Sequence, residues 1–151
     1  GNWWGVLGSV RNGVAALGAL AIVWLAARFN RQLLHASCLA LGAAGFAAMI
    51  LTRDAQALWL PMIGVGVAWA AIVSVPYAIL AGSVPARKMG VYMGIFNIFI
   101  VVPQLVAATL LGFLLRTFFG NEPIWAFAIA ATSFGLAAIA VLFVREDTAE
   151  A

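Results

Sequence analysis

Seven residues in the middle of the chain are of types that bind ligands or bend helices, and they stand within two long apolar stretches. Asp, Glu, Lys and Arg are absent from residues 57–86 and from residues 89–115. As an α-helix each stretch would extend for about 40 Å, and the hydrocarbon core of a bilayer is about 30 Å thick. Polar residues and helix breakers cost free energy at membrane depth, so they indicate a binding site or a packed interior rather than lipid contact. The seven residues are Trp69, Ser74, Pro76, Tyr77, Asn97, Pro103 and Gln104.

The composition of the whole chain is typical of an integral membrane protein. Of the 151 residues, 66% are hydrophobic and 9% are charged, whereas a soluble domain is about half apolar and a quarter charged. The net charge of +3 does not indicate a nucleic-acid partner, because the basic residues stand in short segments between apolar runs. The single cysteine, Cys38, excludes an internal disulfide. Because the chain begins at Gly1 and shows no signal peptide, we expect it to be part of a longer protein.

Five apolar runs predict an all-α, polytopic membrane protein with five transmembrane helices. The alternation in pieces of roughly ten residues that a membrane β-barrel requires is absent from the sequence. The predicted spans are residues 4–25, 33–51, 57–84, 89–115 and 124–144.

An odd number of spans places the two ends of the chain on opposite sides of the membrane, and the basic residues indicate which side is the cytoplasm. Loops and tail on one side carry five basic residues, namely Arg28, Arg31, Arg87, Lys88 and Arg145, and those on the other side carry Arg53 and Arg116. Cytoplasmic segments are enriched in Lys and Arg. We therefore predict a protein of the plasma (inner) membrane whose N-terminus is outside and whose C-terminus is cytoplasmic.

The spans also differ in polarity. The second and fifth have polar residues only near their ends or as hydroxyls that can bond to their own helix, so we expect these two to face lipid. The fourth has a face of small and polar residues, which predicts either close helix packing or the wall of a cavity. This face consists of Gly90, Gly94, Asn97, Val101, Gln104 and Ala108.

The polar residues of the first, third and fourth spans are expected in two layers. With the helix rise of about 1.5 Å per residue, Gln104 should lie close in depth to Trp69 and a little below Arg11. Asn97 should lie about 7 Å further inward, level with Ser74 and Tyr77. Two such layers on three helices would suit a substrate path.

Three motifs in the central block carry a family resemblance. They are Ser74-Val-Pro76-Tyr77-Ala-Ile-Leu, Met89-Gly90-Val-Tyr92-Met-Gly94-Ile-Phe96-Asn97 and Val102-Pro103-Gln104. With them, the chain resembles the sucrose/maltose-type sugar porters of the major facilitator superfamily. The segment Arg28-Phe-Asn-Arg31 looks like a short basic loop of the same family, although Ala27 stands where an Asp is usual and Asn30 where a Gly is usual.

The resemblance implies that the five spans correspond to helices 8–12 of a twelve-helix fold. It implies that helices 8, 10 and 11 line a cavity, that helices 9 and 12 are peripheral, and that N-terminal helices outside this chain complete the path. The implied function is secondary active transport of a sugar, a disaccharide or other glucoside, coupled to protons. The acidic residues here all stand in loops or the tail, so a coupling carboxylate would come from the N-terminal helices.

The predicted site residues fall into three groups, each with a simpler alternative. The substrate-binding candidates are Arg11, Asn12, Trp69, Ser74, Tyr77, Asn97 and Gln104. Alternatively, Arg11 extends its side chain to the lipid headgroups, and Trp69 packs against a neighbouring helix. Asn97 and Gln104 bind sugar hydroxyls or bond between helices. Pro76 and Pro103 are predicted hinges, or static kinks. Predicted inner-loop residues, acting as topological anchors or gates, are Arg28, Arg31, Arg87 and Lys88.

The sequence shows no signal for an enzyme, a metal site or a cofactor. The one histidine, His35, stands at a span end, where an interfacial position is expected. The patterns Gly64-Val-Gly66 and Gly42-Ala-Ala-Gly45 lie within apolar spans and predict helix packing. Small-residue faces also support an alternative function, a membrane scaffold or assembly subunit that transports nothing.

Overall fold

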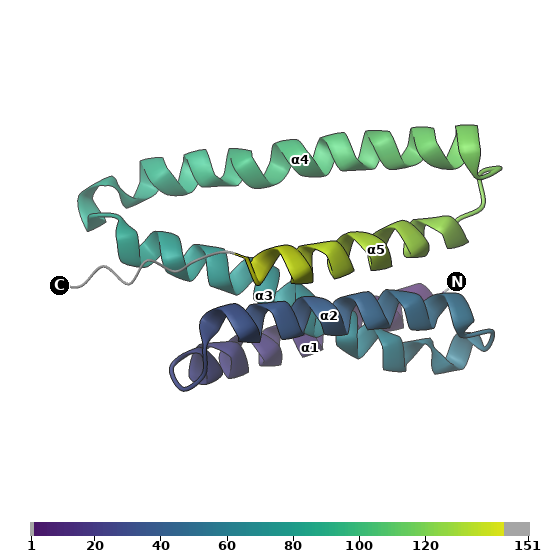
Figure 1. Ribbon diagram of the computed structural model, residues 1–151, viewed down its shortest axis with the longest axis horizontal. Helices are drawn as coiled ribbons and strands as arrows, with labels where there is room; N and C mark the ends of the chain where they lie inside the picture. Colours follow the sequence, from purple (N-terminus) through teal and green to yellow (C-terminus); the bar gives the residue numbers. More distant parts are fainter. Residues whose placement is uncertain (1, 144–151) are drawn as a thin grey trace. The chain divides into compact units, whose positions relative to one another are not determined.

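Helices make up nearly all of the computed structural model, which describes residues 2–143 and, at positions 78, 79 and 83, the backbone alone. No strand occurs in this part of the chain. All five helices are long and apolar enough to cross a membrane, so the prediction of an all-α chain with five such helices is confirmed. In order, the elements are α1 (Trp3–Ala26), α2 (Arg31–Leu51), the 3₁₀ turn η1 (Ala55–Leu58), α3 (Trp59–Ser83), the 3₁₀ turn η2 (Ala86–Lys88), α4 (Met89–Phe118) and α5 (Ile124–Val141) (Figure 1).

The start of α2 corrects the predicted boundary of the second span. Arg31, expected in a loop, is the first residue of this helix. The reason is a local cap, because the side chain of Asn30 accepts hydrogen bonds from the backbone N–H groups of Gln32 and Leu33. These bonds satisfy donors that a helix start leaves without partners.

The end of α4 is a second correction. Arg116, expected in a loop, lies in the last turn of this helix, which continues to Phe118. Gly120 then takes a left-handed conformation, with φ of 59°, and the N–H of Asn121 bonds the Leu115 carbonyl at 2.7 Å. A left-handed glycine after the last turn is a common helix end. The predicted span end Val144 and the inner-side Arg145 lie outside the described residues.

The chain divides into two compact units, which are described separately. Unit 1 comprises Gly1–Ser74 and Phe127–Ala151, and unit 2 comprises Val75–Ala126. The division therefore falls within α3, between Ser74 and Val75, and again near the start of α5.

In unit 1 the backbones of α2 and α3 touch at glycines. A methyl group placed on Gly64 would lie 2.6 Å from the Leu41 carbonyl oxygen, and one on Gly45 would lie 2.6 Å from the Pro61 carbonyl oxygen. One on Gly42 would meet the Cβ of Ala68 at 2.5 Å. Backbone atoms cannot move aside as a flexible side chain can, so these positions exclude any larger residue. The predicted packing role of both glycine patterns is confirmed.

Helix α3 also contacts α1, and small residues again form the contact. A methyl group on Gly66 would lie 2.8 Å from the Arg11 carbonyl oxygen, and one on Gly18 would lie 3.2 Å from the Cβ of Ala70. Leu7 and Ala68 are fully buried. Within unit 1, α1, α2 and the first part of α3 thus lie side by side (Figure 1).

Helix α2 has a packed face toward α3 and α5, and its other face, which includes Leu33, Leu41 and Leu51, is exposed, so its expected lipid contact stays a prediction. Its Phe46 ring packs edge-on against Phe134 of α5, with centroids 5.3 Å apart, and lies 6.4 Å from the Phe127 ring. The packed face was not evident from the sequence, because Gly and Ala make helix contacts without any polar residue to reveal them. The buried residues of this helix are Ala36, Cys38, Leu39, Gly42, Gly45 and Met49.

Unit 2 contains the end of α3, the turn η2 and α4. The Phe119 and Trp125 rings stack with centroids 5.0 Å apart across the connection from α4 to α5. No residue of α4 is buried. Asn97 and Gln104 of α4 are both exposed, so their side chains can reach groups outside unit 2.

The glycine contacts predict a position-specific effect on stability. Gly64→Ala should lower the free energy of unfolding by about 1–3 kcal/mol, because its methyl group would meet a backbone carbonyl. Unfolding of the purified chain by titration with sodium dodecyl sulfate, followed by circular dichroism, measures this change.

Gly13→Ala is the matched control, since nothing lies within 4 Å of a methyl group at Gly13. Its free energy of unfolding should stay the same or rise by up to about 1 kcal/mol, because Ala favours the helix more than Gly does. Equal stability of the two variants would contradict the close packing of α2 and α3.

Candidate functional site

Arg11 of α1 lies over the indole of Trp69 of α3, within unit 1. The guanidinium carbon is 5.8 Å from the ring centroid, which is within the range of a cation–π contact. The close approach at Gly66, three residues before Trp69, brings the Arg11 backbone against α3. Trp69 is 41% exposed, so its ring is not enclosed by packing against a helix.

Arg11 also meets Asn12, the next residue of the same helix. Its Nε and Nη2 atoms lie 3.4 and 3.3 Å from Asn12 Oδ1, longer than a well-formed hydrogen bond. Among residues 2–143, no carboxylate forms an ion pair with Arg11. The structure therefore brings Arg11, Asn12 and Trp69 together, and leaves most of the guanidinium donors available to a ligand, water or headgroups.

In unit 2 a short hydrogen bond connects α3 and α4. The Tyr77 hydroxyl donates to Asn97 Oδ1 at 2.6 Å, and the Tyr77 ring packs edge-on against Phe96 with centroids 5.1 Å apart. The prediction that Tyr77 and Asn97 lie at one level is confirmed. Asn97 is exposed, and in the described part of the chain its Nδ2 donors meet no acceptor. The interhelical bond, one of the two alternatives for Asn97, is thus present and leaves the amide N–H groups free to donate.

The remaining polar candidates are not joined to these clusters. Gln104 is exposed on α4, seven residues and so about two turns beyond Asn97. Ser74 is the last residue of the first segment of unit 1, so it and Tyr77 belong to different units, as do Gln104 and Trp69. The predicted common depths of these pairs stay predictions.

The glycines on the polar face of α4 have no close neighbour within unit 2. Nothing lies within 4 Å of a methyl group placed on Gly90 or Gly94 in the structure described. Within unit 2, the close helix approach expected at Gly90-x-x-x-Gly94 is therefore not made.

The two hinge candidates lie inside continuous helices. Pro76 cannot donate to the Ile72 carbonyl, nor Pro103 to that of Phe99, so each helix lacks one backbone bond. Pro76 is the second residue of unit 2, directly after Val75. Movement about either proline stays a prediction.

The basic candidates differ in their surroundings. Arg28 lies in the connection between α1 and α2 with its guanidinium carbon 4.1 Å from the centroid of the Trp24 ring. Arg87 and Lys88 lie exposed in η2, between α3 and α4, as a turn position predicts. An aromatic partner for Arg28 favours an anchor at the membrane boundary rather than a free gate.

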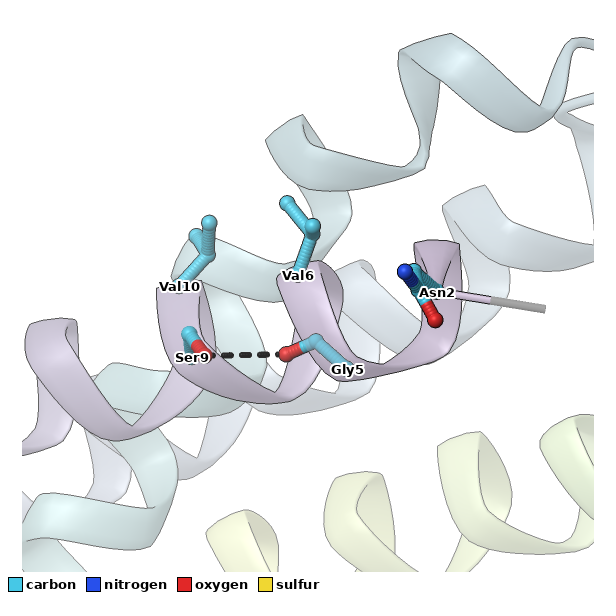
Figure 2. Close-up of a pocket in the computed structure, with 5 residues that line it drawn as sticks. All are labelled: Asn2, Gly5, Val6, Ser9 and Val10. Atoms are coloured by element: carbon cyan, nitrogen blue, oxygen red, sulfur yellow. Dashed lines mark hydrogen bonds between the residues drawn. The ribbon is translucent and has the colours of Figure 1, made fainter.

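A surface hollow on α1 contains none of the predicted site residues. Figure 2 shows its lining, which consists of Asn2, Gly5, Val6, Ser9 and Val10. The Ser9 hydroxyl donates to the Gly5 carbonyl at 2.9 Å, so its hydrogen goes to its own helix. One helix alone forms the hollow, and it offers no convergent polar groups that would bind a ligand.

Two contributors to these clusters were missed from the sequence. Phe96 supports the Tyr77 ring, and Gly66 allows Arg11 to approach α3. The Gly64-Val-Gly66 pattern signalled packing, but which helix each glycine meets depends on how the helices cross. Phe96 stands among many apolar residues of α4, and nothing in its spacing distinguishes it.

No family model, curated protein or solved structure matches this chain. The resemblance to sugar porters therefore stays a prediction that rests on the motifs themselves.

The Tyr77–Asn97 bond predicts a measurable coupling. A double-mutant cycle with Tyr77→Phe and Asn97→Ala should give a coupling free energy of about 0.6 kcal/mol, typical of hydrogen bonds between membrane helices. Detergent unfolding of the four proteins measures it.

Tyr92→Phe with Asn97→Ala is the control cycle, because Tyr92 is the other tyrosine of the chain and does not bond Asn97. These two changes should be additive within about 0.3 kcal/mol. Equal coupling in both cycles would contradict the bond.

Proposed function

We propose that this chain is the substrate-binding part of a secondary active transporter for a sugar. The observation that carries the proposal is the Tyr77–Asn97 pair on α3 and α4. These helices have no charged residue in residues 57–86 or 89–115, and Asn97 nevertheless presents free amide donors on an exposed face. A polar group kept in an otherwise apolar helix marks a ligand or ion path more often than lipid contact.

Sugar hydroxyls suit the groups of this face. An amide both donates and accepts, as a hydroxyl does, and with its Oδ1 occupied by Tyr77, Asn97 keeps two donors for hydroxyl oxygens. Gln104 repeats the same chemistry two turns away on α4. The pair Tyr77–Phe96 fixes the position of the hydroxyl that orients Asn97, so the donors have a defined direction.

The second cluster has the chemistry to hold a sugar ring. The C–H face of a sugar packs on an exposed indole, and the Arg11 guanidinium beside Trp69 offers several donors to ring hydroxyls. Asn12 adds an amide next to Arg11. Ser74 and the hinge prolines complete the proposed set.

Proton coupling requires a group from outside this chain. Asp54 caps η1, and Glu122 lies between α4 and α5, so neither carboxylate stands within a span. In the proposed porter, N-terminal helices supply the coupling acid. The proposed location is the plasma membrane, with the Arg87–Lys88 turn cytoplasmic.

A membrane scaffold is the second candidate, and the open face at Gly90 and Gly94 favours it. The glycine faces of unit 1 make close helix contacts, and this one has no close neighbour within unit 2. A partner subunit would cover it. Gly94→Leu should then abolish self-association of the purified protein in light-scattering measurements, whereas a monomeric porter would show no association to abolish.

Uptake by the protein that contains this chain tests the sugar site. Asn97→Ala should raise the apparent KM for labelled sucrose or maltose by about tenfold, the effect of losing about 1.4 kcal/mol of hydrogen bonding to substrate. Transport by proteoliposomes with equal amounts of reconstituted protein measures it.

Thr109→Ala is the control, since this hydroxyl, also on α4, donates to the Leu105 carbonyl of its own helix. It should leave the KM unchanged. Absence of uptake by the parent, or equal kinetics of the two variants, would contradict the proposal.

The aromatic cluster gives a graded prediction. Trp69→Phe should keep most of the uptake because a ring face remains, while Trp69→Ala should lose it. The Arg11→Gln and Arg11→Lys variants should both transport poorly. Lys keeps the charge but lacks the planar guanidinium with its paired N–H donors. Uptake like the parent's in Arg11→Gln would make Arg11 a snorkelling anchor only.

A further inference from the structure

A groove between α2 and α3 of unit 1 belongs to neither cluster described above. Its volume is about 620 Å³, and its lining is apolar except for Thr52. The Thr52 hydroxyl donates to the Ala48 carbonyl of its own helix at 2.7 Å. The groove can therefore hold an apolar ligand through its shape and apolar contacts rather than through hydrogen bonds.

The sequence explains why a trough exists here. The backbones of the two helices touch at Gly45 and Gly64, and beside that contact α2 has only the methyl groups of Ala44 and Ala48. Larger side chains, among them Leu60, also line the groove. Small residues beside a close helix contact thus leave space for the groove.

The length of the groove matches one leaflet of a bilayer. Its α2 wall runs from Leu41 to Thr52, and eleven residues rise by about 16 Å along a helix. One leaflet contributes about half of the roughly 30 Å hydrocarbon core. An acyl chain of one leaflet would therefore fit the length of the groove.

The end of the groove bears the marks of the headgroup region. Trp59 lines it there, and tryptophans concentrate at the membrane boundary. Arg53 follows Thr52 directly and is exposed, with no ion pair to a carboxylate in residues 2–143. Its neighbour Asp54 is engaged, since Oδ1 accepts the Gln56 N–H at 2.9 Å. Arg53, the residue after the groove-lining Thr52, is thus a cation without an ion pair in the described part of the chain.

We propose that this groove is a phospholipid site, which holds one acyl chain between α2 and α3 with the lipid phosphate beside Arg53. The lipid belongs to the leaflet on the side of the Thr52–Asp54 loop. The proposal rests on insertion of the chain in a membrane and does not depend on transport of a sugar.

Photochemical cross-linking tests the acyl-chain part. The full protein is reconstituted in phosphatidylcholine vesicles that contain phosphatidylglycerol with a diazirine in one acyl chain, and the labelled peptides are mapped by mass spectrometry. Label should concentrate in residues 41–67. Ala44→Leu combined with Ala48→Leu should lower it by about fivefold, because the added side chains fill the trough.

Ala40→Leu combined with Ala47→Leu is the matched control, since both residues are exposed on α2 and neither lines the groove. This variant should keep the label. Even labelling of all five helices, equal label in both double variants, or a cross-link to a second copy of the chain in place of lipid would overturn the proposal.

Arg53→Gln tests the phosphate part. A basic residue near an anionic headgroup contributes a few-fold in affinity, so the label from phosphatidylglycerol should fall by about fivefold. Arg53→Lys should retain it. Unchanged label in Arg53→Gln would contradict the contact between Arg53 and the lipid phosphate.

Flotation with the vesicles confirms insertion of every variant. Sugar uptake by the parent is measured separately, so that failure of this site can be distinguished from failure of the transport proposal.

Discussion

Backbone contact between α3 and its two neighbours in unit 1 is the constraint on which the other features depend. Gly45 and Gly64 bring α2 and α3 within reach of each other's carbonyl groups, and Gly66 does the same for α1. In lipid, helices gain no hydrophobic free energy by associating, so close van der Waals packing at small residues must hold them. The same contacts place Arg11 over Trp69 and leave the apolar groove beside them.

Polar residues serve different purposes in the two units. In unit 2 the Tyr77–Asn97 bond satisfies a hydroxyl and one amide oxygen, which reduces the cost of keeping both in an apolar segment. A structural bond of this kind and a ligand site do not exclude each other, because Asn97 has donors left over. In unit 1, Arg11 has an aromatic partner but no carboxylate among the described residues, so its charge still requires water, headgroups or a ligand.

The helices were predictable because long apolar runs leave few alternatives, and the level of Tyr77 with Asn97 followed from helix rise alone. The boundaries at Arg31 and Arg116 were wrong because they depend on local caps that hydropathy does not record. The burial of α2 was missed for a related reason, since counting polar residues overlooks a helix that packs through Gly and Ala. Which helix a given glycine contacts, such as α1 for Gly66, depends on how the helices cross and cannot be predicted from one sequence.

Whether Asn97 meets water and sugar can be tested directly by cysteine accessibility. Asn97→Cys is made in a Cys38→Ala background, where it is the only thiol of this chain, and is treated with a membrane-impermeant maleimide in proteoliposomes. We predict labelling at Asn97→Cys that sucrose or maltose slows. If the thiol stays unlabelled while one at the exposed Ala86 turn reacts, or if sugar leaves the rate unchanged, α4 does not line a sugar path.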